Sequence, residues 1–215
     1  MHFTRTHRRG DNGAHGLPAV FPMSDERGAL RRVMRERRRA LPAPERIAAA
    51  DALATRLLAL PFAPQSGHAA GYWAMDGEIA LHAWQLRLPR TVRYCLPVLH
   101  ADGTLRFAPW KPGEPLLPNR HGIPEPDVPE AALLRADELD FAVVPLVAFD
   151  ARGQRLGMGG GWYDRSFAFR RTQPGGSRLA GAAFSLQRID TLAVQPWDVP
   201  LDAVCTESDT YLVAP

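Results

Sequence analysis

The segment FAVVPLVAFDARGQRLGMGGGWYDR, residues 141–165, is the most informative part of this 215-residue chain. It begins with an almost wholly apolar run at 141–149, which is typical of a central strand buried on both faces. Four glycines follow: Gly157, Gly159, Gly160 and Gly161. Residues 162–171 can then form a helix. A buried strand, a glycine loop and a helix in this order predict a ligand site at the carboxyl end of a strand in an open α/β sheet.

The glycine loop has the composition of an anion-binding cradle. Glycine allows positive φ angles and close approach of the backbone to a ligand, and a following helix N-terminus presents unpaired N–H groups. Arg155 is expected at the entrance, where it can meet a phosphate, and Asp164 just inside the helix. Trp162 takes the place of the last glycine in G-x-G-x-x-G, which argues against a dinucleotide fingerprint. The structural alternative is a glycine-rich turn in which Asp164 merely caps a helix.

Outside this segment, predicted strands and helices alternate along the chain. Strands are expected at 68–73, 92–96, 104–108, 179–184 and 203–207, and helices at 24–40, 44–60 and 79–88. Six prolines within 112–129 exclude regular structure there and predict a long ordered loop. The alternation predicts a layered α/β fold, in which a mostly parallel sheet is flanked by helices in a single domain at 23–215.

The first two predicted helices each carry an apolar stripe that should face inward. In the first helix the stripe consists of Leu30, Val33 and Met34. In the second helix it consists of Ile47, Leu53, Leu57 and Leu58. The first helix also has a strongly basic face, formed at helical spacing by Arg27, Arg31, Arg35 and Arg38.

The composition is that of a globular protein, with 46% hydrophobic and 23% charged residues. The only two cysteines, Cys95 and Cys205, lie far apart, which excludes a disulfide scaffold or zinc finger and fits a reducing compartment. Both cysteines should be buried in strands. The only lysine, Lys111, precedes Pro112, so no P-loop is present. No apolar run approaches the roughly 18–20 residues of a membrane span. We therefore expect a soluble, cytoplasmic protein.

Positive charge is concentrated near the N-terminus. The first 46 residues contain eleven arginines and five acidic residues, although the net charge of the whole chain is only +3. Residues 1–22 lack apolar periodicity and are expected to form a disordered leader, and Met23 is an alternative start of the protein. The leader lacks the apolar stretch of a secretory signal, whereas its arginines leave a transit peptide as an alternative.

Residues 141–165 closely resemble the signature of the 5-formyltetrahydrofolate cyclo-ligase family, also called 5,10-methenyltetrahydrofolate synthetase. The family pattern is a strand ending in Pro-x-x-Ala-Phe-Asp, followed by Gly-x-Arg-Leu-Gly-x-Gly-x-Gly-aromatic-Tyr-Asp-Arg. The matching residues are Pro145, Ala148, Phe149, Asp150, Gly153, Arg155, Leu156, Gly157, Gly159, Gly161, Tyr163, Asp164 and Arg165. Further family features occur in the same order, so the resemblance covers about residues 27–212.

The resemblance implies an ATP site at the glycine loop. Its residues would be Arg27, Arg31, Arg155, Leu156, Gly157, Met158, Gly159, Gly160, Gly161, Trp162 and Tyr163. Arg155 and Tyr163 are the expected catalytic residues. The family usually has lysine where this chain has Arg27, and the two residues are not equivalent at a phosphate, so Arg31 is the firmer prediction. A solvated basic helix face is the competing interpretation for Arg32, Arg35, Arg37, Arg38 and Arg39.

The resemblance also implies magnesium and a folate. Asp164 and Asp198 match acids associated with magnesium, although Asp198 could equally be an ordinary turn aspartate. Glu78 matches a folate-binding acid, since a carboxylate can accept hydrogen bonds from adjacent pterin N–H groups. The alternative is a glutamate that stabilises a helix N-terminus. Further substrate-binding residues would be Trp73, Met158, Gly160 and Trp162, of which Trp73 is by composition alone a core aromatic.

The implied activity is ATP- and Mg²⁺-dependent closure of 5-formyltetrahydrofolate to 5,10-methenyltetrahydrofolate, with release of ADP and phosphate. The expected partners are these small molecules, and we expect a monomer that binds neither nucleic acid nor membranes. Two other classes stay open: a nucleic-acid-binding protein that uses its arginine-rich N-terminus, and a metabolite-binding protein that has lost turnover. The basic excess stops near residue 46 without a recognition motif, which argues against the first. The presence of Glu78, Arg155 and Asp164 argues against the second.

Overall fold

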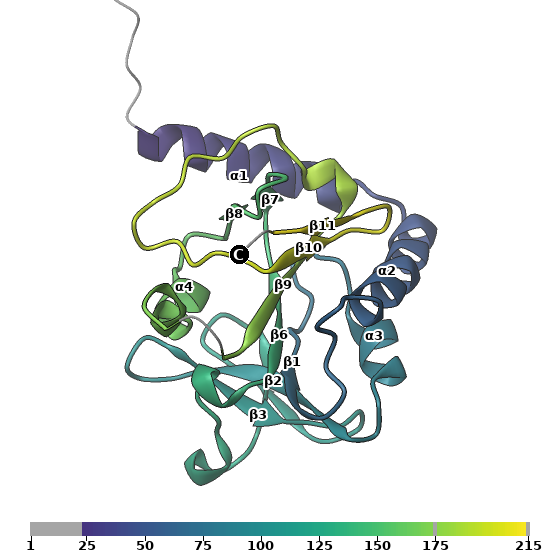
Figure 1. The fold of residues 1–215 in the computed structure, drawn as a ribbon, viewed down its shortest axis with the longest axis vertical. Helices are drawn as coiled ribbons and strands as arrows, with labels where there is room; N and C mark the ends of the chain where they lie inside the picture. The colour runs from purple at the N-terminus through teal and green to yellow at the C-terminus, as the bar shows by residue number, and fades with distance from the viewer. Residues whose placement is uncertain (1–22, 174–175, 214–215) are drawn as a thin grey trace, which may run out of the picture.

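A seven-stranded sheet forms the centre of the computed structural model, which describes residues 23–173 and 176–213 (Figure 1). The strands lie in the order β11-β10-β9-β6-β1-β2-β3. The five inner strands are parallel, whereas the edge strands β3 and β11 run antiparallel to their neighbours. Their bounds are β1 Gly67–Ala70, β2 Val92–Leu99, β3 Leu105–Pro109, β6 Phe141–Pro145, β9 Arg178–Ala182, β10 Ala203–Cys205 and β11 Thr210–Leu212. The predicted single-domain, mostly parallel α/β fold is confirmed.

The apolar strand β6 supplies both layers of the core. Phe141 and Val143 belong to one buried cluster, and Ala142 and Val144 belong to another. Because successive side chains of a strand point to opposite faces of the sheet, only a continuous apolar run can fill both layers. The first layer lies under α2 and α3, and the second contains Phe167, just after α4. Figure 1 shows α2 and α3 on one side of the sheet and α4 on the other.

The helices of the described residues are mostly short. The α-helices are α1 Met23–Arg39, α2 Ala43–Leu58, α3 His82–Arg87 and α4 Trp162–Ser166. The 3₁₀ helices are η1 Glu130–Ala132, η2 Ala136–Glu138, η3 Ala168–Arg171 and η4 Ser185–Gln187. Helix α1 lies near β7 and β8, where Met34 packs on Val147, Ala148 and Leu156. This contact fixes the basic helix beside the glycine loop.

The predicted apolar stripes are partly wrong. In α1, Met34 is buried but Val33 is exposed. In α2, Leu53 and Leu57 are buried, whereas Leu58 is only partly buried and Ile47 is 70% exposed. The buried stripe of α2 runs through small residues as well: Ala49, Ala50, Leu53, Ala54 and Leu57. Alanines occupy the centre of the buried stripe, so Ile47 lies beside it. The apolar pattern gave these alanines too little weight.

Two elements of the 141–171 region are shorter than predicted. The strand ends at Pro145, and the chain then turns so that the Val147 N–H donates to the Leu156 carbonyl at 2.7 Å. A separate two-stranded ribbon follows, with β7 Ala148–Phe149 paired antiparallel to β8 Arg155–Leu156. The predicted helix 162–171 is interrupted at Phe167, which is fully buried in the core. The α-helix therefore ends where the Phe167 ring enters the core.

Other boundaries also differ from the predictions. The first strand ends at Ala70 rather than at residue 73, and the predicted helix at 79–88 is shortened to α3. The predicted strand 203–207 ends at Cys205, and β11 was not predicted. Cys95 and Cys205 are both free and buried in strands, as predicted.

The proline-rich segment contains regular structure, so the prediction of a long irregular loop at 109–130 is wrong. It forms a small antiparallel hairpin of β4 Leu116–Pro118 and β5 Pro124–Pro126. Proline is tolerated in a short strand where its missing N–H would face away from the partner. The side chain of Asn119 stabilises the turn by accepting from the N–H groups of His121 and Ile123. The hairpin bears on function because its turn borders a cavity.

Two further expectations concern the chain outside the sheet. The predicted leader at 1–22 lies outside the residues that the structure describes. In the described part of the chain, no helix combines the length and the apolar character needed to cross a bilayer.

Candidate active site

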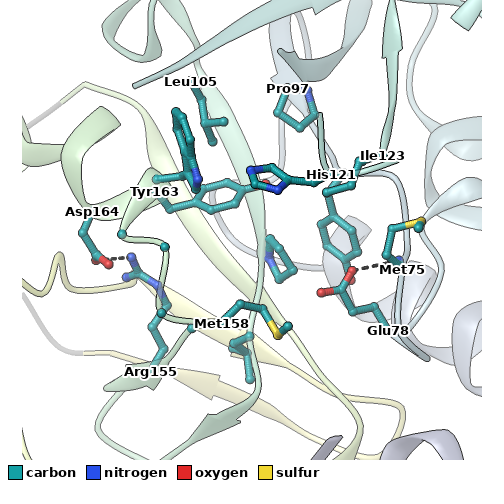
Figure 2. A pocket seen from close by; sticks show the side chains of 18 of the residues that line it. Met75, Glu78, Pro97, Leu105, His121, Ile123, Arg155, Met158, Tyr163 and Asp164 are labelled. Atoms are coloured by element: carbon teal, nitrogen blue, oxygen red, sulfur yellow. Dashed lines mark hydrogen bonds and ion pairs between the residues drawn. The ribbon is translucent and has the colours of Figure 1, made fainter. Parts of the chain in front are cut away.

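A cavity of about 720 Å³ lies at the carboxyl ends of the central parallel strands (Figure 2). Pro145 at the end of β6 and Tyr72 just beyond β1 contribute to its wall. This is the edge at which open α/β sheets bind ligands, because neighbouring strand ends and their loops enclose a crevice there. The volume lies in the usual range for small-molecule sites.

The glycine loop, residues 157–161, forms one wall of this cavity. Gly159 and Gly161 have φ angles of 103° and 66°, a region that other residues rarely adopt. Among the described contacts, none of the five backbone N–H groups of this loop donates a hydrogen bond. Unpaired N–H groups beside a cavity suit an anionic ligand. The helix that follows has only five residues, so the predicted contribution of its N-terminus is small.

Arg155 lies inside the protein rather than at the entrance of the loop. Its guanidinium donates to the Asp164 carboxylate and to the Val199 carbonyl, and its side chain is almost fully buried. Burial lowers the pKa of Arg155, and the carboxylates of Asp164 and Asp198 oppose this effect. The prediction of an entrance position is wrong, because the Asp164 pair draws the side chain inward. Arg155 nevertheless lines the cavity.

Arg27 and Arg31 extend from α1 to the glycine loop. The Arg31 Nε donates to the Gly157 carbonyl at 2.8 Å, and Arg27 lies 3.6 Å from the Asp198 carboxylate. Burial and the positive charge of Arg27 lower the pKa of Arg31. Both residues line the cavity, so the structure brings together the predicted basic pair and the predicted loop.

The basic face of α1 divides into exposed and buried arginines. Arg32 and Arg37 are exposed, as a solvated face predicts. For Arg38 that interpretation is wrong, since its side chain is completely buried. Arg35 and Arg39 both contact Asp76, so neither is simply solvated. The helical spacing of the arginines did not reveal that an acidic turn packs against one side of α1.

Asp164 and Asp198 both line the cavity near the glycine loop. Asp164 Oδ1 accepts from Arg155 and from the Val199 N–H, while Oδ2 accepts no hydrogen bond from the described residues. Asp198 Oδ2 accepts from the Gln195 N–H at 2.9 Å, so Asp198 stabilises a turn as well as lining the cavity. Within residues 23–173 and 176–213, no cluster of three or more acidic, histidine or cysteine side chains could hold a metal. The two carboxylates both face the cavity beside the glycine loop.

Glu78 stands at the opposite end of the cavity and belongs to no helix. Its Oε2 accepts from the Met75 N–H at 3.0 Å, and α3 begins only at His82. The interpretation of Glu78 as a helix-terminal glutamate is therefore wrong. Burial raises the pKa of Glu78, whereas the Met75 hydrogen bond and the nearby Arg38 and Arg35 oppose the rise. The result is a largely buried carboxylate that faces the cavity (Figure 2).

The predicted apolar residues also lie at the cavity. Trp73 is 38% exposed and packs edge-on against Trp110, so the interpretation of Trp73 as a core aromatic is wrong. Met158 is 49% exposed and lines the cavity. The guanidinium groups of Arg120 and Arg165 lie 5.3 and 5.1 Å from the centroid of the Trp162 ring, which also lines the cavity. These apolar surfaces suit a flat aromatic ligand.

Tyr163 lines the cavity beneath the glycine loop, with its ring stacked on Phe167. Burial raises the pKa of Tyr163 well above its usual value, so its hydroxyl stays protonated. Leu156 is the exception among the predicted site residues. Its side chain is fully buried beside Met34 and does not line the cavity, so a direct contact of this side chain with a nucleotide is not supported.

Sequence reasoning missed one wall of the cavity, which comes from β2, β3 and the hairpin turn. Figure 2 shows Pro97, Leu105, His121 and Ile123 lining this wall. Glu125 fastens the hairpin by accepting from the Leu99 N–H at 2.8 Å. The turn residues at 119–122 could have indicated a hairpin, but no sequence signal placed it over the sheet edge.

Comparison with known proteins identifies the family of this chain. Residues 23–207 match the 5-formyltetrahydrofolate cyclo-ligase family. The 5-formyltetrahydrofolate cyclo-ligase of Escherichia coli K12 is 37% identical over 185 residues, which cover 83% of this chain and 99% of that protein. The corresponding protein of Haemophilus influenzae is 35% identical over 181 residues, with 83% and 96% coverage. The NMR structure of Aquifex aeolicus 5,10-methenyltetrahydrofolate synthetase has 28% identity and a TM-score of 0.74, and the match covers 88% of this chain and 93% of that one.

The fold and the site define an α/β protein with one cavity that several elements enclose. A glycine loop and the buried carboxylate of Glu78 both face this cavity. The matches place it in a family of enzymes. The chain belongs to the 5-formyltetrahydrofolate cyclo-ligase family, which confirms the resemblance seen in the sequence.

Proposed function

We propose that this chain closes 5-formyltetrahydrofolate to 5,10-methenyltetrahydrofolate, with hydrolysis of ATP to ADP and phosphate. The observation that carries the proposal is the pairing of two kinds of wall in one cavity. The glycine loop offers unpaired N–H groups and arginines, whereas the Glu78 end offers a buried carboxylate beside aromatic surface. Such a site can hold a phosphate chain and a flat N–H-rich ring at the same time.

The proposed chemistry needs activation of a poor leaving group. The formyl oxygen on N5 attacks the γ-phosphorus of ATP, which breaks the bond to ADP and gives an iminium phosphate. N10 of the same folate then attacks the formyl carbon and loses its proton, and the carbon–oxygen bond breaks to release phosphate. No side-chain nucleophile is required, so the protein contributes mainly positioning and charge stabilisation.

Arginines and loop amides would hold the transferring phosphoryl group. Arg155 uses two of its five N–H groups in the bonds to Asp164 and Val199, which leaves donors for a phosphate at the cavity surface. Arg31 and Arg27 add positive charge from α1. Oriented donors in a closed site stabilise developing charge more strongly than water does.

Asp164 and Asp198 are the residues that would hold Mg²⁺. The oxygen Oδ2 of Asp164, which accepts no hydrogen bond from the described residues, suits a hard cation. When bound, Mg²⁺ would neutralise negative charge on the phosphates of ATP. Asp164 also keeps Arg155 in its buried position, so it contributes to the site in two ways.

Glu78 would bind the pterin ring. Its carboxylate can accept hydrogen bonds from neighbouring pterin N–H groups, while Trp73, Met158 and Trp162 cover the apolar surfaces. Tyr163 would act as a hydrogen-bond donor near the reacting groups, because its raised pKa keeps the hydroxyl protonated.

The proposal is tested by incubating the protein with ATP, Mg²⁺ and 5-formyltetrahydrofolate while following the methenyl chromophore and the release of ADP. We expect equal amounts of both products. Binding of nucleotide without ATP consumption would instead support a metabolite-binding protein that has lost turnover. The variant Arg37→Met is a suitable control, because Arg37 is exposed and does not line the cavity.

The proposal also covers the location, the oligomeric state and the partners of the protein. We propose a cytoplasmic monomer that acts on small molecules rather than on nucleic acid. Two buried, free cysteines are compatible with a reducing compartment. Salt-dependent binding to DNA or RNA would contradict this part of the proposal.

A further inference from the structure

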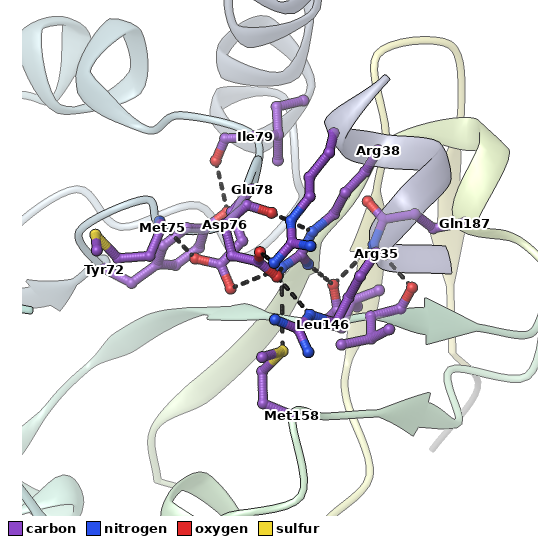
Figure 3. A network of polar contacts seen from close by, with 12 residues as sticks. Arg35, Arg38, Tyr72, Met75, Asp76, Glu78, Ile79, Leu146, Met158 and Gln187 are labelled. Atoms are coloured by element: carbon purple, nitrogen blue, oxygen red, sulfur yellow. Dashed lines mark hydrogen bonds and ion pairs between the residues drawn. The ribbon is translucent and has the colours of Figure 1, made fainter. Parts of the chain in front are cut away.

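Arg38 is a buried charge that the reaction described above does not use. Its side chain is completely buried, which is uncommon for arginine. Nε donates to the Asp76 carbonyl at 2.9 Å, Nη2 donates to the Asp76 carboxylate at 2.9 Å, and Nη1 donates to the Leu146 carbonyl at 3.3 Å (Figure 3). Arg38 does not line the cavity. Nη2 also contacts the Met158 sulfur at 4.0 Å. Three oxygen acceptors and this sulfur therefore hold the planar guanidinium in one orientation directly behind the site.

The turn that carries Glu78 packs directly on this arginine. Asp76 has a φ angle of 53° and is the only non-glycine residue with positive φ in the described residues. Its carboxylate is contacted by Arg35, Arg38 and Arg39. A left-handed residue costs free energy, and three guanidinium groups around one carboxylate can offset that cost. The conformation of the turn thus depends on α1.

Arg38 also faces Glu78 itself. The distance from Arg38 Nη2 to Glu78 Oε1 is 3.8 Å, which is an ion-pair distance but too long for a hydrogen bond. Glu78 Oε1 therefore keeps its capacity to accept from a ligand, while Oε2 accepts from the Met75 N–H. A buried carboxylate tends to take up a proton unless positive charge lies nearby. Arg38 supplies such a charge without occupying the oxygen.

We propose that Arg38 is a positioning residue for substrate recognition, which keeps Glu78 ionised and fixes the 75–78 turn at the folate end of the cavity. The inference rests on the proposed function, because it assigns Glu78 to the folate. Arg38 acts through Glu78 and Asp76 and does not contact the substrate. The competing explanation is that Arg38 only ties α1 to the sheet through Leu146.

The charged and titratable groups near Glu78 come from α1, from the segment just after β1, from α4 and from its own turn: Arg35, Arg38, Tyr72, Tyr163 and Asp76. Burial raises the pKa values of both tyrosines, so they stay neutral in an ordinary pH range. Arginine stays protonated throughout. His121 also lines the cavity, so the Glu78→Gln variant is needed to separate the two groups. The part of the pH dependence that Glu78→Gln removes reports on Glu78, and loss of Arg38 should move the midpoint of that part to higher pH.

The experiment is a double-variant cycle. Dissociation constants of 5-formyltetrahydrofolate are measured by calorimetry for wild type, Arg38→Met, Glu78→Gln and the double variant, from about pH 4.5 to about pH 8.5, so that the range begins near the ordinary pKa of a glutamate. We expect Arg38→Met to weaken folate binding about tenfold or more near neutral pH and to raise the pH midpoint, since one pKa unit corresponds to a tenfold change. In the Glu78→Gln background, the same change should weaken binding by no more than about twofold.

Two matched variants separate positioning from general effects. Arg37→Met removes an exposed charge from the same helix, and Arg39→Met removes a half-exposed partner of Asp76. We expect the first to leave folate affinity and its pH midpoint unchanged, and the second to affect both less than Arg38→Met. Thermal unfolding of each variant reports the purely structural contribution.

The outcomes decide the proposal. Equal weakening by Arg38→Met in both backgrounds, or a lower melting temperature with unchanged folate affinity and pH midpoint, would overturn it. If Arg38→Met does not fold, the cycle is run with Arg38→Lys, which keeps the positive charge but loses the planar guanidinium with its several N–H donors. The proposal is then supported if Arg38→Lys weakens folate binding with a nearly unchanged pH midpoint and if this weakening is absent in the Glu78→Gln background. Equal weakening in both backgrounds overturns it. Failure of the wild-type protein to bind or convert 5-formyltetrahydrofolate would instead overturn the proposed function.

Discussion

The glycine loop and the 75–78 turn form opposite ends of one cavity, but they present different kinds of chemistry. At the glycine loop, residues 157–161, the backbone N–H groups are unpaired among the described contacts. At the 75–78 turn, the cavity-facing group is the side chain of Glu78, and Arg38 lies beside both Glu78 and Asp76. One end therefore combines main-chain N–H groups with arginines, whereas the other depends on a single carboxylate in a turn that packs against a distant helix.

This difference determines how each end should respond to substitution. Backbone chemistry is sensitive to conformation, so a substitution at a positive-φ glycine of the loop should matter more than the same substitution at a glycine with an ordinary φ. Side-chain chemistry is sensitive to charge and to hydrogen-bond direction, because a misplaced donor in a buried site costs its full desolvation free energy. The following predictions use this contrast.

The largest effect is expected for Arg155→Ala. The change removes a phosphate donor and leaves Asp164 without its arginine, so turnover should fall about a hundredfold or more, with a raised ATP requirement. Steady-state kinetics with varied ATP measures this, and thermal unfolding runs in parallel. Unchanged ATP kinetics with reduced stability would assign Arg155 a structural role only.

The next effect is expected for Glu78→Gln, which sharpens the contrast between the two ends. The amide turns one acceptor into a donor that would face the N–H groups of the pterin. Such a clash costs about 1–3 kcal/mol, so folate binding should weaken about ten- to a hundredfold. A KM for 5-formyltetrahydrofolate close to that of wild type would contradict the assignment of Glu78.

At the glycine loop, Gly159→Ala should weaken ATP binding about tenfold with a small effect on folate. A Cβ at a φ of 103° is strained, which costs about 1–2 kcal/mol and disturbs the loop N–H groups. Gly157→Ala is the matched control, because a Cβ added there meets nothing within 4 Å and its φ is not positive. Equal ATP affinities of the two variants would show that loop conformation is not decisive.

The smallest effect concerns pH. Folate binding by the wild-type protein should weaken as pH falls through the pKa of Glu78, because the protonated acid loses an acceptor. Since burial raises this pKa, the loss should begin at a higher pH than for an exposed glutamate. Calorimetric titrations across mildly acidic pH measure the effect, and Glu78→Gln should remove it. A flat profile in wild type would contradict an ionised Glu78 as the pterin acceptor.

Much of the fold and of the glycine loop could be predicted from the sequence. The apolar run of β6 and the glycines after it are local patterns, and a local pattern fixes local backbone structure. The same locality explains the errors. Nothing near Phe167 indicated that its ring would enter the core and interrupt the helix, and nothing near Ile47 showed that alanines form the buried stripe.

The folate end illustrates what local patterns leave out. Glu78 was found through family resemblance, but the burial of Arg38 depends on a turn 38 residues away. A run of arginines on a helix is usually solvated, and its sequence is the same whether or not an acidic turn packs against it. The wall made by His121 was missed for a similar reason, because the hairpin is placed over the sheet edge by a long-range bond from Leu99 to Glu125.

The central claim is that the glycine loop binds nucleotide and the Glu78 end binds folate within one cavity. It is tested most directly by calorimetric titration of ATP alone and of 5-formyltetrahydrofolate alone into Gly159→Ala and into Glu78→Gln. We predict a crossed result, in which Gly159→Ala loses affinity mainly for ATP and Glu78→Gln mainly for folate. Either variant weakening the binding of both ligands equally would contradict the account. So would a result in which Gly159→Ala loses affinity mainly for folate and Glu78→Gln mainly for ATP.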